Sequence, residues 1–165
     1  MKLAYLTLLS LFLLFSTPVH SEELKASEVA AAHGMSWWSV DLSEMKDEQM
    51  TIHFEIEFAD GKKSSSGSIN FHQGDTVKVF CWRNLRGELK VAAVFNGGTG
   101  RMSTRFHNNP FAKAKVITTP SRLGSTVKSG AILIKGTNGN SVTSSQTLEK
   151  GTFGLKVILK PYQDK

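Results

Sequence analysis

Residues 49–58 read QMTIHFEIEF, and their alternation of apolar and polar residues is the clearest sign of the fold. Apolar side chains lie at every second position from Met50 to Phe58, and polar or charged side chains lie between them. Successive side chains of a β-strand point to opposite faces of its sheet, so this alternation predicts a strand with one buried face. Asp60 and Gly61 follow, and this dipeptide is typical of a two-residue hairpin turn.

The residues after this turn fit the second strand of the same hairpin. A two-residue turn pairs Ile52 with Ile69 and places Phe54 opposite Gly67, which the phenylalanine side chain can cover. Because one register explains the apolar positions of both segments, we expect an antiparallel hairpin here.

The rest of the chain continues with short segments of similar pattern, separated by turn residues. We expect strands near residues 37–42, 75–82, 88–96, 101–107, 114–119, 130–135 and 152–160. Many short strands at this spacing predict an all-β protein, an antiparallel β-sandwich with a small barrel as the variant. Segments 75–82 and 88–96 carry apolar residues on both faces, which indicates central or covered strands.

The end of the chain offers one resemblance to a known family. Residues 148–161, LEKGTFGLKVILKP, form a tight turn and then a strand with alternate apolar positions from Phe153 to Leu159. This stretch of about a dozen residues resembles the last strand of many immunoglobulin-like modules. The resemblance implies an immunoglobulin-like form of the sandwich.

The N-terminal region has the layout of a secretory signal peptide. Lys2 precedes an apolar run over residues 3–15, and small or branched residues precede a cleavage site after residue 21. The mature chain is then 22–165, one β-sandwich domain that begins with a short helix at 27–33.

Export sets the expected location and the redox environment. After cleavage no segment is apolar and long enough to cross a membrane, so we expect a periplasmic or extracellular protein of bacterial type. Cys81 is the only cysteine and alternates with Val77 and Val79, so it is expected to be buried rather than reactive.

Charge is distributed unevenly along the mature chain. Residues 22–60 hold ten acidic and two basic residues, whereas residues 89–148 hold eight basic residues and no acidic one. One interpretation is a basic face for an anionic partner. The other is internal neutralisation, in which the acidic part packs beside the basic part.

For an anionic partner, the candidate binding residues are Arg101, Arg105, Lys113, Lys115 and Arg122. Partners that fit are anionic polysaccharide, lipid headgroups or an acidic protein surface; nucleic acid is not expected, because the chain is exported. Exchange of both Arg101 and Arg105 for Glu is expected to abolish such binding and to leave the fold intact.

No catalytic, metal or cofactor site is predicted. The histidines of the mature chain form no close chelating pair: His33, His53, His72 and His107. Glu55 and Glu57 share one strand face, but their regular alternation with core residues indicates a solvated surface rather than a carboxylate pair for hydrolysis. No nucleophile motif or phosphate-binding loop is present in the sequence.

The sequence therefore predicts an exported, non-catalytic binding or interaction protein that engages an anionic partner through residues 89–148. Two alternatives remain open at this point. One is a structural or assembly subunit of a cell-surface or periplasmic complex. The other is an enzyme or small-ligand-binding sandwich whose site is assembled from distant residues.

Overall fold

The computed structural model describes residues 34–43, 49–72, 74–95, 106 and 109–162, together with the backbone of 100–104. The expected signal peptide at 1–21 and the expected helix at 27–33 lie outside these residues. The described residues form an all-β protein with two five-stranded sheets, and the short 3₁₀ helix η2 (Pro110–Ala112) is the helical element that positions the site below.

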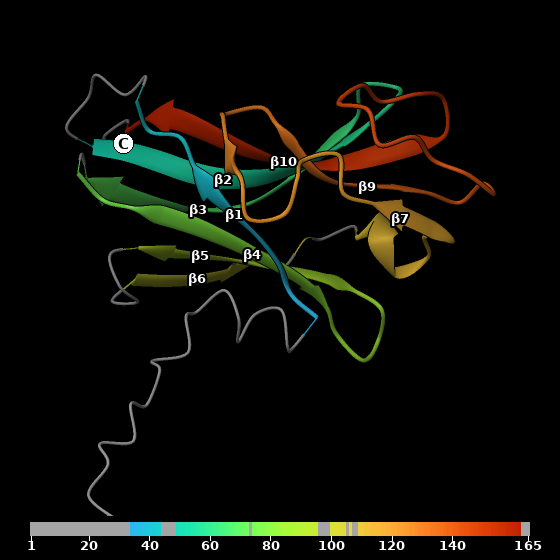
Figure 1. Cartoon of the computed structure of the whole chain (residues 1–165), viewed down its shortest axis with the longest axis horizontal. Coiled ribbons are helices and arrows are strands. Elements are labelled where there is room, and N and C mark those ends of the chain that lie inside the picture. Colours follow the sequence, from blue (N-terminus) through green and yellow to red (C-terminus); the bar gives the residue numbers. More distant parts are fainter. Residues whose placement is uncertain are drawn as a thin grey trace, which may run out of the picture.

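The first sheet contains both segments that were expected to be central. Its strand order is β6 (Gly100–Thr104), β5 (Leu89–Phe95), β4 (Val77–Arg83), β1 (Ser36–Val40) and β8 (Thr126–Val127) (Figure 1). Neighbouring strands are antiparallel, except that β1 and β8 are parallel. β4 and β5 both lie inside the sheet, as their two apolar faces predicted. The two-residue strand β8 was not predicted.

The second sheet contains the predicted hairpin and the last strand of the chain. Its order is β3 (Lys63–His72), β2 (Gln49–Phe58), β10 (Thr152–Pro161), β9 (Ile132–Thr137) and β7 (Val116–Thr118), and all neighbours are antiparallel. The bounds of β2 agree with the predicted strand at 49–58.

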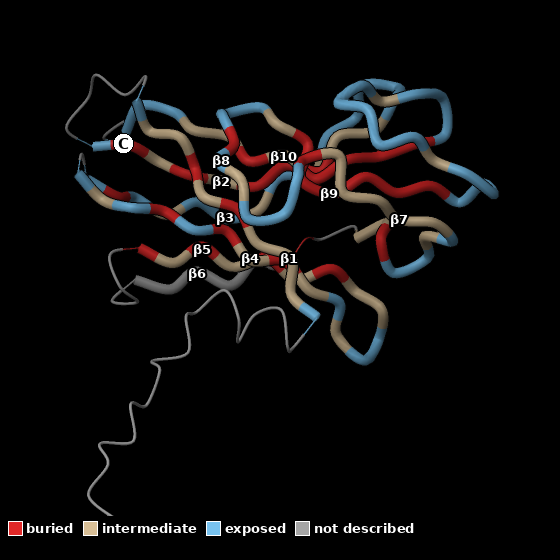
Figure 2. Tube along the Cα trace, in the orientation of Figure 1, coloured by how far each residue is buried: buried red, intermediate tan, exposed pale blue. Residues whose placement is uncertain are grey.

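One hydrophobic cluster includes residues of both sheets. Val79 in β4 and Val91 in β5 are fully buried, and so are Phe54 in β2 and Leu155 in β10. In Figure 2, buried residues alternate with less buried ones along β4 and β5. The alternation arises because every second side chain of each strand faces the same side.

Cys81 belongs to this cluster. It is 1% exposed, and burial raises the pKa of its thiol. The buried interpretation of Cys81 is therefore confirmed, and with a suppressed thiolate it behaves as a small apolar residue.

The β2–β3 hairpin differs from its prediction at the turn. Glu57 pairs with Lys63, and the Phe58 amide donates to the Lys62 carbonyl at 2.8 Å. The connection is therefore a three-residue loop at 59–61, with Gly61 at a φ of 84°, and not the predicted two-residue turn. Glycine adopts this left-handed conformation without steric cost, so Asp-Gly suits both turns.

A bulge in β3 restores the predicted register farther along the hairpin. Between His53 and Glu55 the pairing shifts by one residue, so that Ile52 still lies opposite Ile69. The Phe54 amide donates to the Ser66 hydroxyl at 3.0 Å, beside the extra residue. The predicted Phe54–Gly67 pair is therefore replaced by a bulge at 66–67.

No helix of the described residues is long and apolar enough to span a membrane.

Candidate binding cleft

Residues 89–148, the acid-free stretch, contain two basic residues that are neutralised by acidic residues just outside it. The Lys90 ammonium group lies 2.9 Å from the Glu88 carboxylate, and the Lys135 ammonium group lies 2.8 Å from the Glu149 carboxylate. Neither lysine is therefore available as a free positive charge for a partner.

Three other bases of the stretch are exposed and, within the described residues, form no ion pair: Lys113, Lys115 and Arg122. Arg101 lies in β6, where its backbone pairs with Val94. Arg105 lies outside the described residues.

The five predicted binding residues do not all lie on one short segment of surface. β6, which contains Arg101, is one edge of the first sheet, and the loop with Arg122 leads to β8 at the opposite edge. Four strand spacings separate these edges, roughly 19 Å. Lys113 and Lys115 lie beside β7, at an edge of the second sheet.

Two acids of residues 22–60 are paired within the second sheet, whereas a third, Asp41, interacts with the basic stretch: its pKa is lowered by hydrogen bonds from Ser43 and, to a smaller extent, by the charge of Lys128. The Glu57 carboxylate lies 2.6 Å from the Lys156 ammonium group, and the Glu55 carboxylate lies 2.9 Å from that of Lys63. Both lysines lie outside residues 89–148. The pKa of Glu57 is lowered, mainly by the hydrogen bond from Lys156. Glu55 and Glu57 are thus neutralised within the second sheet.

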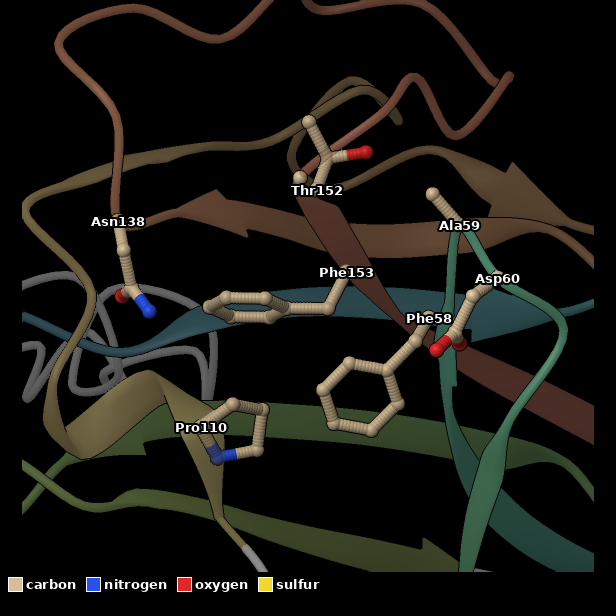
Figure 3. Close-up of a pocket in the computed structure, with 8 residues that line it drawn as sticks. Phe58, Ala59, Asp60, Pro110, Asn138, Thr152 and Phe153 are labelled. Carbon is tan, nitrogen blue, oxygen red and sulfur yellow. The ribbon is translucent and has the colours of Figure 1, made fainter.

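A cleft of about 250 Å³ lies where one end of the second sheet meets η2 (Figure 3). The β2–β3 turn, η2, and the ends of the β9–β10 loop supply its lining residues. These are Phe58, Ala59, Asp60, Pro110, Asn138, Gly151, Thr152 and Phe153.

Aromatic rings form the apolar part of the cleft. The half-buried Phe58 ring lies 5.9 Å from the buried Phe153 ring, centroid to centroid, and Phe111 packs edge-on against Phe153 at 4.9 Å. A side-chain carbon at Gly136 would lie 2.7 Å from the Phe153 ring. Glycine at this position therefore leaves room for the ring, which is fixed from two sides.

Two polar side chains complete the cleft. In the view of Figure 3, the Asn138 amide and the Asp60 carboxylate lie on opposite sides of the two phenylalanine rings. Asp60 accepts hydrogen bonds from the Lys62 amide at 3.0 Å and from the Lys62 ammonium group at 2.9 Å. These interactions lower the pKa of Asp60, so the carboxylate is ionised at neutral pH beside its own counter-charge.

Backbone hydrogen bonds place Lys113 and Lys115 next to residues at this cleft. The Lys113 amide donates to the carbonyl of Pro110, a lining residue, at 3.1 Å. The Lys115 amide donates to the Thr137 carbonyl at 3.0 Å, directly before Asn138. Two lysines of the predicted set, without an ion pair in the part of the chain that the structure describes, thus lie beside an aromatic cleft.

Polar contacts to the first sheet hold η2 in place. Arg83 in β4 donates from Nη2 to the Phe111 carbonyl at 3.0 Å and from Nε to the Gly87 carbonyl at 2.9 Å. Asn109 donates from Nδ2 to the Leu89 carbonyl at 2.8 Å. The cleft is therefore built from both sheets: the first fixes η2, and the second supplies the phenylalanine rings.

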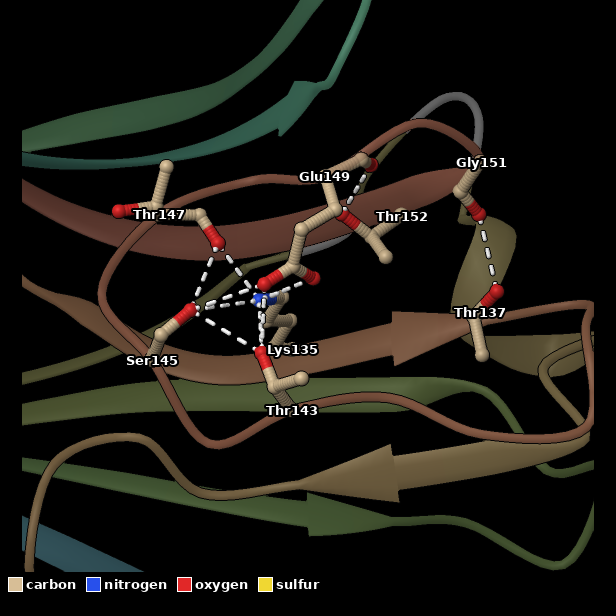
Figure 4. A network of polar contacts seen from close by, with 8 residues as sticks. All are labelled: Lys135, Thr137, Thr143, Ser145, Thr147, Glu149, Gly151 and Thr152. Carbon is tan, nitrogen blue, oxygen red and sulfur yellow. Dashed lines mark hydrogen bonds and ion pairs between the residues drawn. The ribbon is translucent and has the colours of Figure 1, made fainter.

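A buried lysine organises the β9–β10 loop, which carries Asn138. The fully buried Lys135 ammonium group contacts the Glu149 carboxylate, the Ser145 hydroxyl at 3.2 Å and the Thr147 carbonyl at 2.5 Å (Figure 4). The hydrogen bond from Lys135 is the main cause that lowers the pKa of Glu149 to about 2. One cation thus gathers several acceptors of a loop that has little secondary structure of its own.

A second, larger cleft of about 460 Å³ lies between β1, the start of β4 and β8. Its lining residues include Asp41, Asp75 and Lys78, so two negative charges face one positive charge and the cleft is less favourable for an anion. The described residues contain no group of three or more acidic, histidine or cysteine side chains that could hold a metal ion.

Sequence reasoning selected the two lysines but missed the cleft beside them. In the sequence, Phe58 and Phe153 occupy the alternate apolar positions of strands, which indicates core residues. Pro110 and Asn138 lie in segments rich in turn residues, which indicates loops. Their meeting depends on contacts between residues far apart in the chain, for which the sequence holds no local signal. Comparisons with protein-family models, curated proteins and solved structures found no significant match to this chain.

Proposed function

We propose that this protein is an exported, non-catalytic binding protein whose partner carries negative charge. In this proposal the two sheets pack as an immunoglobulin-like β-sandwich in one domain, residues 22–165, after loss of a signal peptide at 1–21. The protein then acts in the periplasm or outside the cell. The pattern of the first 21 residues supports the export, and the hydrophobic cluster shared by both sheets supports the sandwich.

The main support for an anionic partner is a set of exposed basic residues that form no ion pair among the described residues. Lys113, Lys115 and Arg122 form no ion pair within the described residues, whereas Lys90 and Lys135 of the same stretch do. Exposed charges of one sign attract an oppositely charged partner and speed its association.

Asp60 is the one titratable side chain among the eight described lining residues of the aromatic cleft, so this lining offers no pair of groups for acid and base catalysis. Asp60 has a lowered pKa because Lys62 stabilises its charged form. A carboxylate with a lowered pKa is a weak general base and is not protonated at neutral pH, so it cannot act as a general acid there.

The proposal is tested by retention on immobilised heparin and on a plain cation exchanger of similar charge density, with the mature chain 22–165. We expect heparin to retain the protein to a higher salt concentration than the exchanger does. The variant Lys113→Glu/Lys115→Glu should lose this difference, with about a tenfold weaker affinity for heparin. A matched control, Lys78→Glu/Lys160→Glu, changes the net charge by the same amount outside residues 89–148 and should keep the difference.

The variant Arg101→Glu/Arg105→Glu tests the remaining part of the predicted set. A polyanion long enough to reach both edges of the first sheet should lose affinity with this variant as well. If the control variant and the two test variants all reduce heparin binding equally, only net charge matters, and the proposed anion-binding region is wrong.

A further inference from the structure

We propose that the cleft at 58–60, 110, 138 and 151–153 binds one acidic sugar residue of a polysaccharide. The sugar ring lies against Phe58 and Pro110, and its carboxylate points toward Lys113 and Lys115. This inference rests on the proposed function, because it narrows the anionic partner to an acidic polysaccharide.

The size of the cleft suits a single sugar unit. Its volume is about 250 Å³, just below the ~300–1,000 Å³ typical of pockets that enclose drug-sized ligands. A pyranose ring is smaller than such ligands, and the cleft is open to solvent at the exposed residues Ala59, Asp60 and Asn138. The neighbouring units of a polysaccharide can therefore leave the cleft on either side.

The aromatic lining matches the apolar face of a sugar. A pyranose ring presents C–H groups on its faces and hydroxyl groups at its edge. The face of a phenylalanine ring is electron-rich and attracts C–H groups that carry partial positive charge. Phe58 is half-buried and so keeps part of its ring accessible, while Phe153, packed against Phe111, supports it from behind.

The polar lining matches the edge of a sugar. Each sugar hydroxyl both donates and accepts a hydrogen bond. The Asn138 amide offers a donor and an acceptor, and the Asp60 carboxylate offers acceptors. Because Lys62 neutralises Asp60 at 2.9 Å, this carboxylate can accept from hydroxyls without strongly repelling a negatively charged ligand.

The lysines supply the preference for an acidic sugar over a neutral one. Lys113 follows η2 and Lys115 precedes β7, and both are exposed without an ion pair in the described residues. Their ammonium groups extend on flexible stems from backbone positions bonded to Pro110 and Thr137, so they can reach a carboxylate held at the cleft.

The other anionic partners fit this cleft less well. A lipid headgroup brings acyl chains that need a continuous apolar groove or a membrane surface. An acidic protein segment offers carboxylates, but it lacks the ring of several hydroxyl groups that the Asn138 amide and the Asp60 carboxylate can bind. The combination of aromatic rings, amide, carboxylate and lysines therefore favours a sugar acid.

The test uses tri-galacturonate and a heparin-derived tetrasaccharide as probes, with binding measured by isothermal titration calorimetry. Asn138→Trp places a large side chain at the cleft and should weaken binding of both probes at least tenfold. Asn140→Trp, two residues along the same exposed loop and outside the lining, is the matched control and should bind as the unchanged protein does. Circular dichroism checks that both variants fold.

Two further probes separate sugar recognition from charge alone. The methyl ester of tri-galacturonate lacks the charge and should bind at least tenfold more weakly than the acid. Poly-glutamate and phosphatidylglycerol vesicles carry charge without a sugar, and their binding should not respond to Asn138→Trp.

The results distinguish this inference from the function on which it rests. If the protein keeps its preference for heparin over the cation exchanger, but Asn138→Trp binds both oligosaccharides as tightly as the unchanged protein, the sugar cleft is wrong and the anion-binding function stands. If vesicles or poly-glutamate bind as tightly as the oligosaccharides and lose affinity with Asn138→Trp, the cleft does not select sugars. If the preference for heparin is absent, both proposals fail.

Discussion

Lys135 shows how one residue can fix a long loop. Its ammonium group is fully buried, and a buried charge is costly unless acceptors surround it. Four groups from the loop at 138–151 meet this need: Thr143, Ser145, Thr147 and Glu149. Because the loop begins at Asn138 and ends beside the cleft, the same contacts also position one side of the proposed sugar site.

Glu149 should make part of the stability depend on acidic pH. Its pKa is lowered from 4.5 to about 2, so the ionised form is favoured by folding. The stabilisation is complete above the unfolded pKa and is lost as the pH falls from about 4.5 toward 2. We expect Glu149→Gln to lower the urea midpoint at pH 7 and to approach the unchanged protein near pH 2.

The comparison is a series of urea unfolding curves between pH 7 and pH 2. Glu88→Gln serves as a comparison: a hydrogen bond from Lys90 also lowers the pKa of Glu88, but this pair closes no long loop, so its effect on the urea midpoint should be smaller than that of Glu149→Gln. Parallel pH profiles for the unchanged protein and Glu149→Gln would contradict the role given to Glu149.

At the scale of elements, the β2–β3 hairpin contains two irregularities that compensate. The loop at 59–61 has one residue more than the predicted turn, and the bulge at 66–67 adds one residue to β3. The longer loop shifts the β2–β3 register by one residue, and the bulge shifts it back. The bulge also reverses the face of β3, so that Ser64 and not Ser65 lies opposite Ile56.

The bulge lies on a strand at the edge of its sheet. β3 is ten residues long and has no charged side chain between Lys63 and His72, which makes it a possible template for another chain. A bulge twists an edge strand and interrupts its row of free backbone groups. We therefore expect the bulge at 66–67 to disfavour pairing of this edge with another chain.

Deletion of Gly67 should remove the bulge and keep all other β2–β3 pairs. The shortened strand then pairs in one continuous register, with Ile52 still opposite the original Ile69. We expect a folded protein that self-associates as its concentration rises, measured by sedimentation velocity. Gly67→Ala keeps the chain length and should self-associate no more than the unchanged protein. A monomeric deletion variant at every concentration would show that the bulge does not protect this edge.

At the scale of the whole molecule, the two sheets are expected to unfold together. All three tryptophans of the chain lie in β1 and β4 of the first sheet, whereas Leu155 lies in β10 of the second. Trp38 and Leu155 are both fully buried in the same hydrophobic cluster. Tryptophan fluorescence therefore reports on one sheet, and a core substitution can be placed in the other.

Leu155→Ala should destabilise the protein by about 2–5 kcal/mol, because it leaves a cavity in a fully buried site. If the sheets form one sandwich, the tryptophan fluorescence transition in urea should move by the same amount as the circular dichroism transition. Leu123→Ala, a change at an exposed leucine, should move neither transition. A fluorescence transition that stays in place while circular dichroism shifts would show that the sheets unfold independently.

The charge layout also belongs to the whole molecule. The sequence separates acids from bases along the chain, but the described ion pairs form mainly between residues of the same sheet or the same segment. The ammonium groups of Lys90 and Lys135 are not available to a partner, because Glu88 and Glu149, just outside residues 89–148, neutralise them. Lys113 and Lys115 remain available, because no described carboxylate forms an ion pair with either ammonium group.

The sequence alone determined the elements of this protein that depend on local alternation. β2, β4, β10, the pairing of Ile52 with Ile69 and the burial of Cys81 follow from a period of two, whereas β6, β7 and β9 were placed mainly by the turn residues around them. This period is a property of neighbouring residues, so it can be read without knowing the fold. The exact turn could not be read, because a left-handed glycine suits both loop lengths.

Only the tertiary structure decided which residues form the cleft and which bases have no ion pair among the described residues. Phe58, Pro110 and Asn138 are separated by long stretches of chain and meet because the second sheet and η2 pack at one end. Such contacts depend on strand order and on loop paths, which cannot be predicted from a repeating pattern of neighbouring residues. The chain thus specifies its strands locally, and its proposed binding site arises from how those strands pack.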